Sequence, residues 1–441
     1  MTYVAYVTKL TNVRPHPNAD RLQLGDCFGN TVCVDLGFID GQLGVYFPTD
    51  GQLSEKFCEV NNLVRKKDAA GNNIGGYLDP EKRNVRAINL RGQKSDGLFL
   101  PLSCLDAFGD TSTLQVGDTI STFNGHEICQ KYIPARPVNA IGKAGNRARK
   151  KKVPVAPLFM EHADTEQLAY NLSVFRPGDQ IEITLKMHGT SQRTGYLPVL
   201  KGYKRTLIDK LFRREGTPIY DWGYISGTRR TVLEDYEGGY YGSNEFREAH
   251  SKIFEGKLWK GETVYYEVVG FTQDGTPIMA TADNKKVQDP DFTKQYGKTT
   301  TFSYGCEPKE SKLYVYRMTM TNEDGNVVEY TPDFMRYRCE QMGVNCVPVF
   351  WRGFIPDNLD STEYAAGNYV RSLAEKFYDG PDPVGKTHVR EGIVVRIVDR
   401  PKFTAYKHKN FSFKVLEGIA KDSATAPDME EAQEEINEEE N

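Results

Sequence analysis

A lysine at position 186 has the sequence context that covalent chemistry needs. It ends a stretch, residues 180–186, in which apolar and polar side chains alternate, and this period predicts a half-buried strand. Gly189 comes three residues later, where the missing side chain lets a ligand approach the backbone. A lysine at such a place is either a surface charge or a nucleophile, and the order Lys-Met-His-Gly-Thr-Ser favours the nucleophile.

Two carboxylates, an aromatic ring and two amines follow on later stretches with strand periodicity. Glu267 lies in the middle of one stretch, Tyr316 in the next, and Glu391 begins a third beside a glycine. Lys407 and Lys409 share one face of the last strand, because successive strand residues point to opposite sides. Each glutamate alone is typical of a surface strand, whereas the ordered set indicates one shared site.

These segments together resemble the motifs of the covalent nucleotidyltransferases, the superfamily of ATP-dependent ligases and mRNA capping enzymes. The nucleophile motif, K-x-D/H-G, reads Lys-Met-His-Gly at 186–189, and histidine in its third place is closer to RNA ligases than to DNA ligases. The sequence Ser-Gly-Thr-Arg-Arg at 226–230 is similar to the arginine-bearing segment of the family. The resemblance runs from about residue 176 to residue 410.

The resemblance implies a role for each of these residues. Lys186 is the expected nucleophile that attacks the α-phosphorus of ATP, with Gly189 beside the nucleotide and His188 as a structural hydrogen-bonding residue behind the lysine. The pair Lys407 and Lys409 is expected to hold the α-phosphate. These cations and a metal ion favour the neutral, reactive amine and spread the charge that develops on the phosphoryl oxygens.

The same resemblance implies the contacts to the rest of the nucleotide. Tyr316 is expected to stack on adenine, with Tyr314 as the reserve because Tyr316 is followed by arginine where the family often has aspartate. Glu267 is expected to accept a hydrogen bond from the ribose. Glu391 is expected to hold a hydrated Mg²⁺, or Mn²⁺, through water. The sequence does not choose between Arg229 and Arg230 for a phosphate contact.

Arg193 is a weaker candidate for a phosphate contact. It lies within the segment that follows the nucleophile motif, and its side chain belongs to a stretch with strand character. We expect it to face solvent.

The fold class that these patterns predict is α+β, with an N-terminal OB-like β-barrel and a nucleotidyltransferase (ATP-grasp-like DNA/RNA ligase) domain of antiparallel sheets flanked by helices. Residues 1–125 read as short strands, and the stretches 16–22 and 86–100 resemble the OB fold of tRNA-binding domains. We expect a basic linker at 126–160, an adenylyltransferase domain at 161–420, and an acidic disordered tail at 421–441.

Helices are expected near 244–256, 332–343 and 361–378, the last with Ser361 or Thr362 as its cap. Residues 198–245 read as an extended excursion between strands.

Composition and charge are consistent with a cytoplasmic protein that meets a polyanion. No apolar run is long enough to span a membrane, and eight scattered cysteines without a C-x-x-C pair argue against a zinc ribbon or a disulfide scaffold. The net charge of −4 becomes +4 when the eight acidic side chains from Asp428 onward are set aside. A basic body and a run of lysine and arginine at 143–152 suit nucleic acid.

The predicted function is an ATP-dependent RNA ligase that joins 3'-OH and 5'-phosphate ends, as in a nicked duplex. An OB module before the catalytic domain resembles the Deinococcus-type nick-sealing RNA ligases, and we expect this module to contact nucleic acid. A capping-type guanylyltransferase would carry its OB domain after Lys409. A DNA ligase differs through 2'-OH contacts that the sequence does not locate. A nucleic-acid-binding protein with an inactive fold would have lost one of Lys186, Glu391, Lys407 and Lys409.

Overall fold

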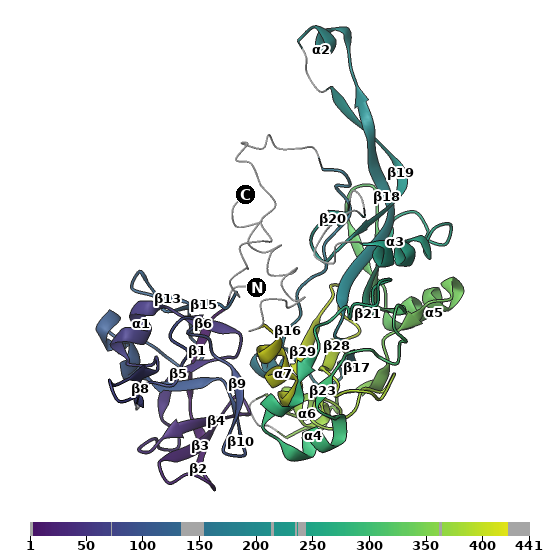
Figure 1. Ribbon diagram of the computed structural model, residues 1–441. Helices are drawn as coiled ribbons and strands as arrows, with labels where there is room; N and C mark the ends of the chain where they lie inside the picture. The colour runs from purple at the N-terminus through teal and green to yellow at the C-terminus, as the bar shows by residue number, and fades with distance from the viewer. Residues whose placement is uncertain are drawn as a thin grey trace. The chain divides into compact units, whose positions relative to one another are not determined.

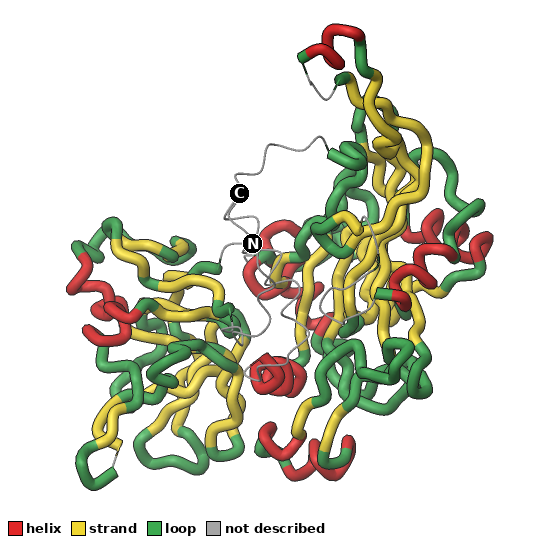
Figure 2. Tube along the Cα trace, turned by 45° about the horizontal axis from the view of Figure 1, so that its top comes forward, coloured by secondary structure: helices red, strands yellow, loops and turns green. Residues whose placement is uncertain are grey.

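The computed structural model describes residues 3–71, 73–133, 154–212, 216–233, 236, 244–360 and 364–421. The chain divides into two compact units, which are considered separately. Unit 1 comprises Met1–Arg136, Ala282–Thr300 and Asn410–Ala426, and unit 2 comprises Pro137–Thr281, Thr301–Lys409 and Pro427–Asn441. Strands dominate both units and helices are short (Figure 2). Within the described ranges, no helix has the length and apolar character needed to cross a bilayer.

Unit 1 is built from short antiparallel strands. Its main sheet has the order β11-β5-β1-β12, and a three-stranded sheet has the order β2-β3-β4. The strands are β1 (Ala5–Lys9), β2 (Thr11–Pro15), β3 (Leu22–Cys27), β4 (Asn30–Asp35), β5 (Leu43–Phe47), β6 (Gly51–Leu53), β7 (Lys66–Lys67), β8 (Asn73–Gly75), β9 (Ala87–Leu90), β10 (Gln93–Asp96), β11 (Leu98–Pro101), β12 (Thr119–Ile120), β13 (Thr122–Phe123), β14 (His126–Glu127), β15 (Cys129–Lys131), β22 (Ala282–Asp283) and β23 (Thr299–Thr300). Its helices are α1 (Glu55–Val60), α4 (Pro290–Tyr296) and α7 (Phe411–Lys421), with 3₁₀ turns at Leu102–Phe108 and Asn284–Val287.

The predicted barrel is present only as these separate antiparallel sheets, because the strand ladders of the described residues do not form one closed circuit. The two stretches that suggested it nevertheless meet. The ring Nε2 of His16 lies 3.1 Å from the carbonyl oxygen of Leu90, and the side-chain amide of Asn18 donates to the carbonyl of Arg91 at 2.8 Å. His16 is buried, so this motif residue holds unit 1 together.

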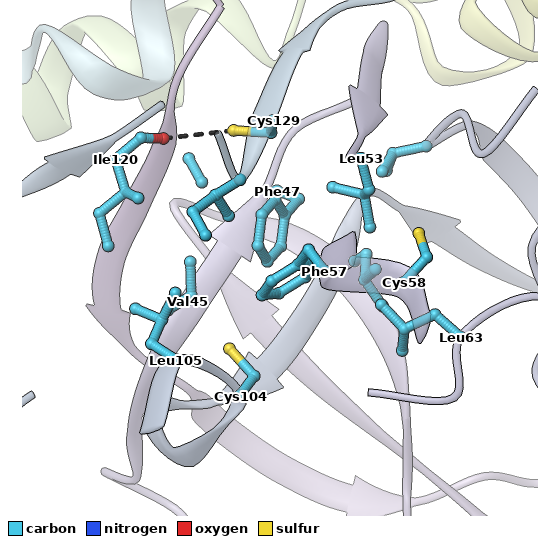
Figure 3. Close-up of a cluster of buried hydrophobic side chains, with 14 of the residues drawn as sticks. Val45, Phe47, Leu53, Phe57, Cys58, Leu63, Cys104, Leu105, Ile120 and Cys129 are labelled. Carbon is cyan, nitrogen blue, oxygen red and sulfur yellow. Dashed lines mark hydrogen bonds between the residues drawn. The ribbon is translucent and has the colours of Figure 1, made fainter. Parts of the chain in front are cut away.

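The core of unit 1 is formed by buried side chains of the main sheet, of α1 and of the 3₁₀ turn Leu102–Phe108 (Figure 3). Phe47 and Phe57 pack with ring centroids 5.5 Å apart, and Val45 and Leu105 are fully buried beside them. Cys129 donates its thiol to the carbonyl of Ile120. All eight cysteines are free, as expected without a disulfide scaffold.

Two segments distant in sequence belong to unit 1, although the predicted adenylyltransferase domain, 161–420, includes both. Lys414 on α7 forms a 2.6 Å ion pair with the buried carboxylate of Asp96. The side chain of Asn89 donates to the carbonyl of Val287 at 2.7 Å. The strands β14 and β15 also occupy residues at the start of the predicted linker. The basic run 143–152, the tail beyond 421 and the predicted caps Ser361 and Thr362 lie outside the described residues.

Unit 2 contains two large sheets. A five-stranded sheet has the order β16-β29-β28-β17-β27, and a seven-stranded sheet has the path β20-β19-β18-β21-β24-β25, with β26 paired to β24. The strands are β16 (Glu166–Gln167), β17 (Gln180–Lys186), β18 (Thr190–Lys204), β19 (Thr217–Gly227), β20 (Val232–Leu233), β21 (Glu262–Gly270), β24 (Ser311–Thr321), β25 (Val327–Glu329), β26 (Asn345–Cys346), β27 (Val349–Phe354), β28 (Gly392–Ile397) and β29 (Ala405–Lys409). The helices are α2 (Leu207–Leu211), α3 (Glu245–Lys252), α5 (Pro332–Met342) and α6 (Ala365–Ala374), with 3₁₀ turns at Leu168–Tyr170 and Leu172–Val174.

The predicted α+β class is confirmed by these sheets and helices, and three expected helices are present as α3, α5 and α6. The excursion expected at 198–245 contains the long hairpin of β18 and β19, which extends away from the rest of unit 2 (Figure 1). Helix α5 begins where Thr331 accepts a hydrogen bond from the amide of Phe334, and it ends at Gly343 in the left-handed conformation.

His250 on α3 gives the stability of unit 2 a pH dependence. Its ring lies 2.9 Å from the hydroxyl of Ser311, and burial lowers its pKa from 6.5 to about 4. Between pH 6.5 and about 4 the unfolded chain therefore binds a proton that the folded chain does not, and the folded state loses stability as the pH falls through this window.

We expect His250→Gln to remove this titration. Between pH 6.5 and 4.5 the variant should lose about 2–3 kcal/mol less unfolding free energy than the wild type. Urea unfolding at several pH values measures the difference. His126→Gln, at an exposed histidine, is the control. Parallel pH profiles for wild type and His250→Gln would contradict the assignment.

Candidate active site

Lys186 lies at the end of β17, at the same level of the five-stranded sheet as residues of β28 and β29. It is opposite Gly392 on β28, and Gly392 is opposite Lys409 on β29. The residue before Gly392 is Glu391, so the antiparallel register alone gathers three of the predicted residues at one end of the sheet.

The three side chains form what we name the lysine–glutamate cluster: Lys186, Glu391 and Lys409. One carboxylate oxygen of Glu391 lies 2.8 Å from Nζ of Lys186 and 3.3 Å from Nζ of Lys409. The carboxylate is 2% exposed, whereas the side chain of Lys186 is 24% exposed and therefore reachable from outside. Lys407 is half-buried two residues before Lys409, on the same face of β29. The cluster is a buried negative charge held between two amines, one of which opens to solvent.

Two glycines make this geometry possible. Gly392 has φ +147°, and a Cβ there would meet the carbonyl oxygen of His408 at 2.2 Å. At Gly189 a Cβ would lie 2.3 Å from the carbonyl oxygen of Val268. The chain therefore passes from the five-stranded sheet into the seven-stranded sheet within residues 187–189, in close contact with β21.

A buried tyrosine fixes the backbone directly after Lys186. The amide N–H of His188 donates to the hydroxyl of Tyr304 at 2.7 Å, and the His188 ring packs edge-on against Phe302 at 4.7 Å. Burial raises the pKa of Tyr304 well above its ordinary value, and the carboxylates of Glu391 and Glu267 raise it further. Tyr304 is thus in electrostatic reach of acidic residues from both sheets.

The loop that carries Glu391 packs against the same tyrosine. His388 is fully buried, with its ring 4.5 Å from that of Tyr304 and 5.1 Å from that of Phe302. Its Nδ1 lies 2.9 Å from the carbonyl of Val389 and must be the donor, because a carbonyl oxygen only accepts. The aromatic cluster therefore connects the segment after Lys186 to the segment before Glu391.

The start of that loop is fixed by a buried aspartate. The carboxylate of Asp382 accepts backbone N–H donors from residues 384, 385 and 386 at 3.0, 2.6 and 2.9 Å. A Cβ on Gly385 would meet the backbone nitrogen of Gly305 at 2.3 Å. Sequence reasoning missed Tyr304, His388 and Asp382, because their contacts join segments with no shared periodicity.

Glu267 and Tyr316 lie together on the seven-stranded sheet. Glu267 is opposite Ser191 on β18, so these two side chains share a face. The register of β21 and β24 shifts where Tyr265 and Tyr266 face Arg317 and Val315, which leaves Tyr316 as the extra residue of a bulge. The hydroxyl of Tyr316 lies 3.1 Å from that of Ser191, and burial followed by the charge of Glu267 raises its pKa.

His162 packs beside this tyrosine and was not predicted. Its ring centroid lies 5.0 Å from that of Tyr316 and 5.4 Å from that of Phe403, and its Nδ1 is 3.3 Å from the guanidinium of Arg317. Burial lowers the pKa of His162 well below its usual range, and the positive charges of Arg317, Arg229, Arg193 and Lys186 lower it further. The face of Tyr316 is therefore flanked by a neutral ring in a positive environment.

Arg229 and Arg230 follow the end of β19 and both reach Asp164. The guanidinium of Arg229 pairs with one carboxylate oxygen, and that of Arg230 lies 3.6 Å from the other. Arg229 also acts electrostatically on Tyr316 and His162, which brings this pair to the Tyr316 side of the site.

The expectation that Arg193 faces solvent is wrong. Its side chain is 1% exposed, its guanidinium lies 4.4 Å from the ring of Phe159, and it donates to the carbonyl of Arg230 at 2.9 Å. The strand period alone cannot show that residues 154–160 cover this face, so Arg193 supports the Arg229–Arg230 turn from behind.

The fit of a divalent cation rests on the donor set. Among the described residues no group of three or more His, Cys, Asp or Glu side chains could hold an ion alone. Glu391 offers a hard oxygen donor beside the site, which suits Mg²⁺ that keeps most of its waters and takes other ligands from phosphates. The residues present therefore fit a hydrated ion and not a cage made only of protein groups.

Comparison with solved structures identifies the fold of this chain. No family model matches the sequence, and no curated protein matches it. Solved structures of Naegleria gruberi RNA ligase are similar: one variant with ATP and Mn has 17% identity and a TM-score of 0.54, and the match covers 93% of this chain and 98% of that chain. An apo variant has 18% identity and a TM-score of 0.54, covering 94% and 97%. The ligase with PPi has 17% identity and a TM-score of 0.53, covering 93% and 97%. The chain thus has the fold of an RNA ligase along most of its length.

The contact at Gly189 can be tested by stability. We expect Gly189→Ala to destabilise unit 2 by about 1–3 kcal/mol, because the added methyl would overlap the Val268 carbonyl. Denaturant unfolding measures this. Gly223→Ala on β19 is the matched control, since its nearest neighbour is the flexible end of Lys201. Equal stability of the two variants would show that no close approach exists at Gly189.

Proposed function

We propose that this protein is an ATP-dependent RNA ligase that joins 3'-OH and 5'-phosphate ends through a lysyl-AMP intermediate. The observation that carries the proposal is the lysine–glutamate cluster, in which a half-open lysine amine lies between a buried carboxylate and a second amine. The RNA ligase fold supports the same reaction class.

In the first step Nζ of Lys186 attacks the α-phosphorus of ATP. A nitrogen–phosphorus bond forms, the bond to the bridging oxygen breaks, and pyrophosphate leaves. The Lys186 ammonium must first give a proton to solvent, which reaches its 24% exposed side chain, because a lysine is ordinarily protonated near neutral pH. In the cluster the charge of this ammonium is balanced by the carboxylate of Glu391. The amine becomes reactive when another positive charge pairs with this carboxylate, because Lys186 then loses the partner that favours its protonated form.

The other amines act on the phosphate. Lys409, with Lys407 on the same face of β29, would hold the α-phosphate and stabilise the charge that develops on its oxygens. When bound, Mg²⁺ or Mn²⁺ supplies positive charge to the triphosphate and to Glu391 through water. Lys409 already contacts Glu391, so its ammonium stays next to the reacting group during transfer.

The nucleoside part would bind on the seven-stranded sheet. Tyr316 is half-buried and stands out at a bulge, whereas Tyr314 is 7% exposed, which favours Tyr316 as the ring that stacks on adenine. Glu267 would accept a hydrogen bond from the ribose. Tyr304 has contact with both the His188 backbone and the Glu391 loop, so we assign it as a positioning residue.

AMP would then pass from Lys186 to the 5'-phosphate of RNA, and attack by the 3'-OH would release it. Arg229 or Arg230 would contact a phosphate of ATP or of the nick, after exchange of its contact with Asp164. We further propose that unit 1 contains an OB-like module that binds nucleic acid, that the basic run at 143–152 adds phosphate contacts, and that the protein seals nicked duplex RNA in the cytoplasm, as the Deinococcus-type ligases imply.

Three alternatives make different predictions. A capping-type guanylyltransferase would react with GTP. A DNA ligase would seal DNA as readily as RNA. A binding protein with an inactive fold would form no covalent adduct, although Lys186, Glu391, Lys407 and Lys409 are all present.

The decisive experiment follows the first step. Wild-type protein incubated with Mg²⁺ and labelled ATP should carry an acid-labile adenylate, and Lys186→Ala should carry none. Lys252→Ala, at an exposed lysine that pairs with Glu248, should be labelled like wild type. Label retained by Lys186→Ala would remove the assigned nucleophile, and stronger labelling by GTP would favour the capping enzyme.

Removal of the Tyr304 hydroxyl tests the positioning role of this residue. We expect Tyr304→Phe to slow lysine adenylylation about tenfold without a change in KM for ATP, because the amide of His188 loses its acceptor. Rapid-quench kinetics measures the rate. Tyr330→Phe, which removes a buried hydroxyl bound to Glu262, is the matched control. The positioning role fails if both variants slow the step equally or if neither does.

A further inference from the structure

The hairpin of β18 and β19 continues beyond β21 as a two-stranded ribbon, which binds the carbonyls of Pro154 and Val155. The last pair between β18 and β21 is Gly195 with Thr263, whereas β18 and β19 remain paired as far as Lys204 and Thr217. We name residues 196–224 the ribbon arm, which Figure 1 shows extending from unit 2. None of the candidate site residues lies in this arm.

The register gathers aromatic side chains on one face of the ribbon arm. Tyr196 is opposite Tyr224, Leu200 is opposite Tyr220, and Tyr203 is opposite Pro218. A register shift between Leu200 and Gly202 keeps Tyr203 on the face of the residues before it. This aromatic face, all of whose rings are half-buried, consists of Tyr196, Tyr203, Tyr220, Trp222 and Tyr224.

The rings lie close enough to form a platform. Tyr196 and Tyr224 stack with centroids 4.6 Å apart and planes inclined by 19°, and Trp222 lies 5.8 Å from Tyr196. Nζ of the exposed Lys260 lies 5.1 Å from the centre of the Trp222 ring. A row of tyrosine and tryptophan faces with a cation beside them is the composition that stacks on nucleic-acid bases.

The reverse face near the base of the arm is already covered. Leu197 and Ile225 are buried there against Ala156 and Phe159. On the aromatic face, two hydroxyls bind the backbone nearby: that of Tyr220 donates to the carbonyl of Pro154 at 2.9 Å, and that of Tyr224 accepts from the amide of Gly256 at 2.6 Å. The half-buried rings of this face are the side of the ribbon that a ligand can reach.

Exposed cations lie along the upper part of the ribbon arm. Lys201, Lys204 and Arg205 are exposed. Two acidic residues nearby are engaged locally: Asp209 accepts from the amide and hydroxyl of Thr206, and Asp221 accepts from the amide of Trp222. The sequence of the arm carries six basic and three acidic side chains. Its charge is thus complementary to a polyanion.

We infer that the ribbon arm binds a single-stranded segment of the RNA substrate, with unpaired bases stacked on its aromatic face and phosphates beside Lys204 and Arg205. This inference rests on the proposed function and identifies a surface of unit 2 that holds RNA away from the reacting ends. A protein partner fits the aromatic face less well, because the exposed aliphatic side chains, Leu207 and Leu211 at 84% and 77% exposure, lie at the tip.

The length of β18 sets how long an RNA must be to reach both the nucleotide site and the ribbon arm. Ser191 lies beside the nucleotide site and Tyr203 lies twelve residues further, which corresponds to about 40 Å of extended strand. RNA that reaches both therefore needs on the order of ten nucleotides on that side of the junction. Shorter RNA would occupy the site without the arm.

The test compares two double variants with a control of equal charge. Tyr203→Ala/Tyr220→Ala should weaken the binding of the long duplex, a nicked RNA duplex with about 6 base pairs and a single-stranded extension of about 24 nucleotides on each side, by about tenfold or more. Lys204→Ala/Arg205→Ala should lower the slope of log affinity against log salt by about 1.4–1.8. Lys252→Ala/Lys376→Ala removes two exposed cations elsewhere in unit 2 and should leave both values unchanged. Fluorescence anisotropy gives the Kd at each salt concentration.

A second variant removes the outer part of the arm, so that a loss of RNA binding cannot be attributed to a misfolded arm. Replacement of residues 201–219 by an Asn-Gly turn should reduce affinity for the long duplex but not for the same nicked duplex without its single-stranded extensions. Labelling of Lys186 by ATP should be unchanged in every arm variant, so a failure of the proposed function would appear there and not in the binding data. Wild-type affinity for the long duplex in all arm variants would overturn the inference.

Discussion

The site of this protein depends on one buried carboxylate that two amines share across three strands. Glu391 is 2% exposed and lies between Lys186 on β17 and Lys409 on β29. A buried charge is costly unless it is paired, and loss of one partner leaves the other charge without compensation. The register of β17, β28 and β29 therefore does more than form a sheet, since a slip of one residue would move each lysine to the opposite face.

The carboxylate is held in place by a chain of buried contacts outside the sheet. Asp382 gathers three backbone donors, His388 fits between Phe302 and Tyr304, and the Tyr304 hydroxyl accepts the amide of His188. The two ends of this chain are the segments beside Glu391 and Lys186. The separation of the segments that carry Lys186 and Glu391 is consequently set from both sides, by strand pairing and by this aromatic cluster.

The sequence predicted the strands that carry the candidate residues, because periodicity carries this information. Alternation located the strands of Lys186, Glu267, Tyr316, Glu391 and Lys409, and antiparallel pairing brings Lys186, Glu391 and Lys409 together. It could not predict Tyr304, His388 or His162, because each acts through a contact between loops distant in sequence. Arg193 was misjudged for a related reason, since the ring that covers it comes from residues 154–160. The placement of α7 with unit 1 depends likewise on single long-range contacts such as that of Lys414 with Asp96.

The same geometry explains how a ligase of this kind could keep its nucleophile unreactive without substrate. The sheet leaves the backbone at Lys186 little freedom to move, because Lys186 is paired with Gly392 on β28 and its strand is paired with β27 as far as Thr184. Its partner Glu391 is fixed by the Asp382 loop and by Gly392, where no larger residue fits. Activation by a large movement of either backbone segment is therefore disfavoured. What remains variable is charge: in the proposed reaction a nucleotide would bring phosphates to Lys409 and Lys407 and a cation to Glu391, and this redistribution would weaken the pairing of Lys186 with its counter-ion. Under the proposed function, the rigid pairing seen here is the resting form of a site that ligand charge switches on.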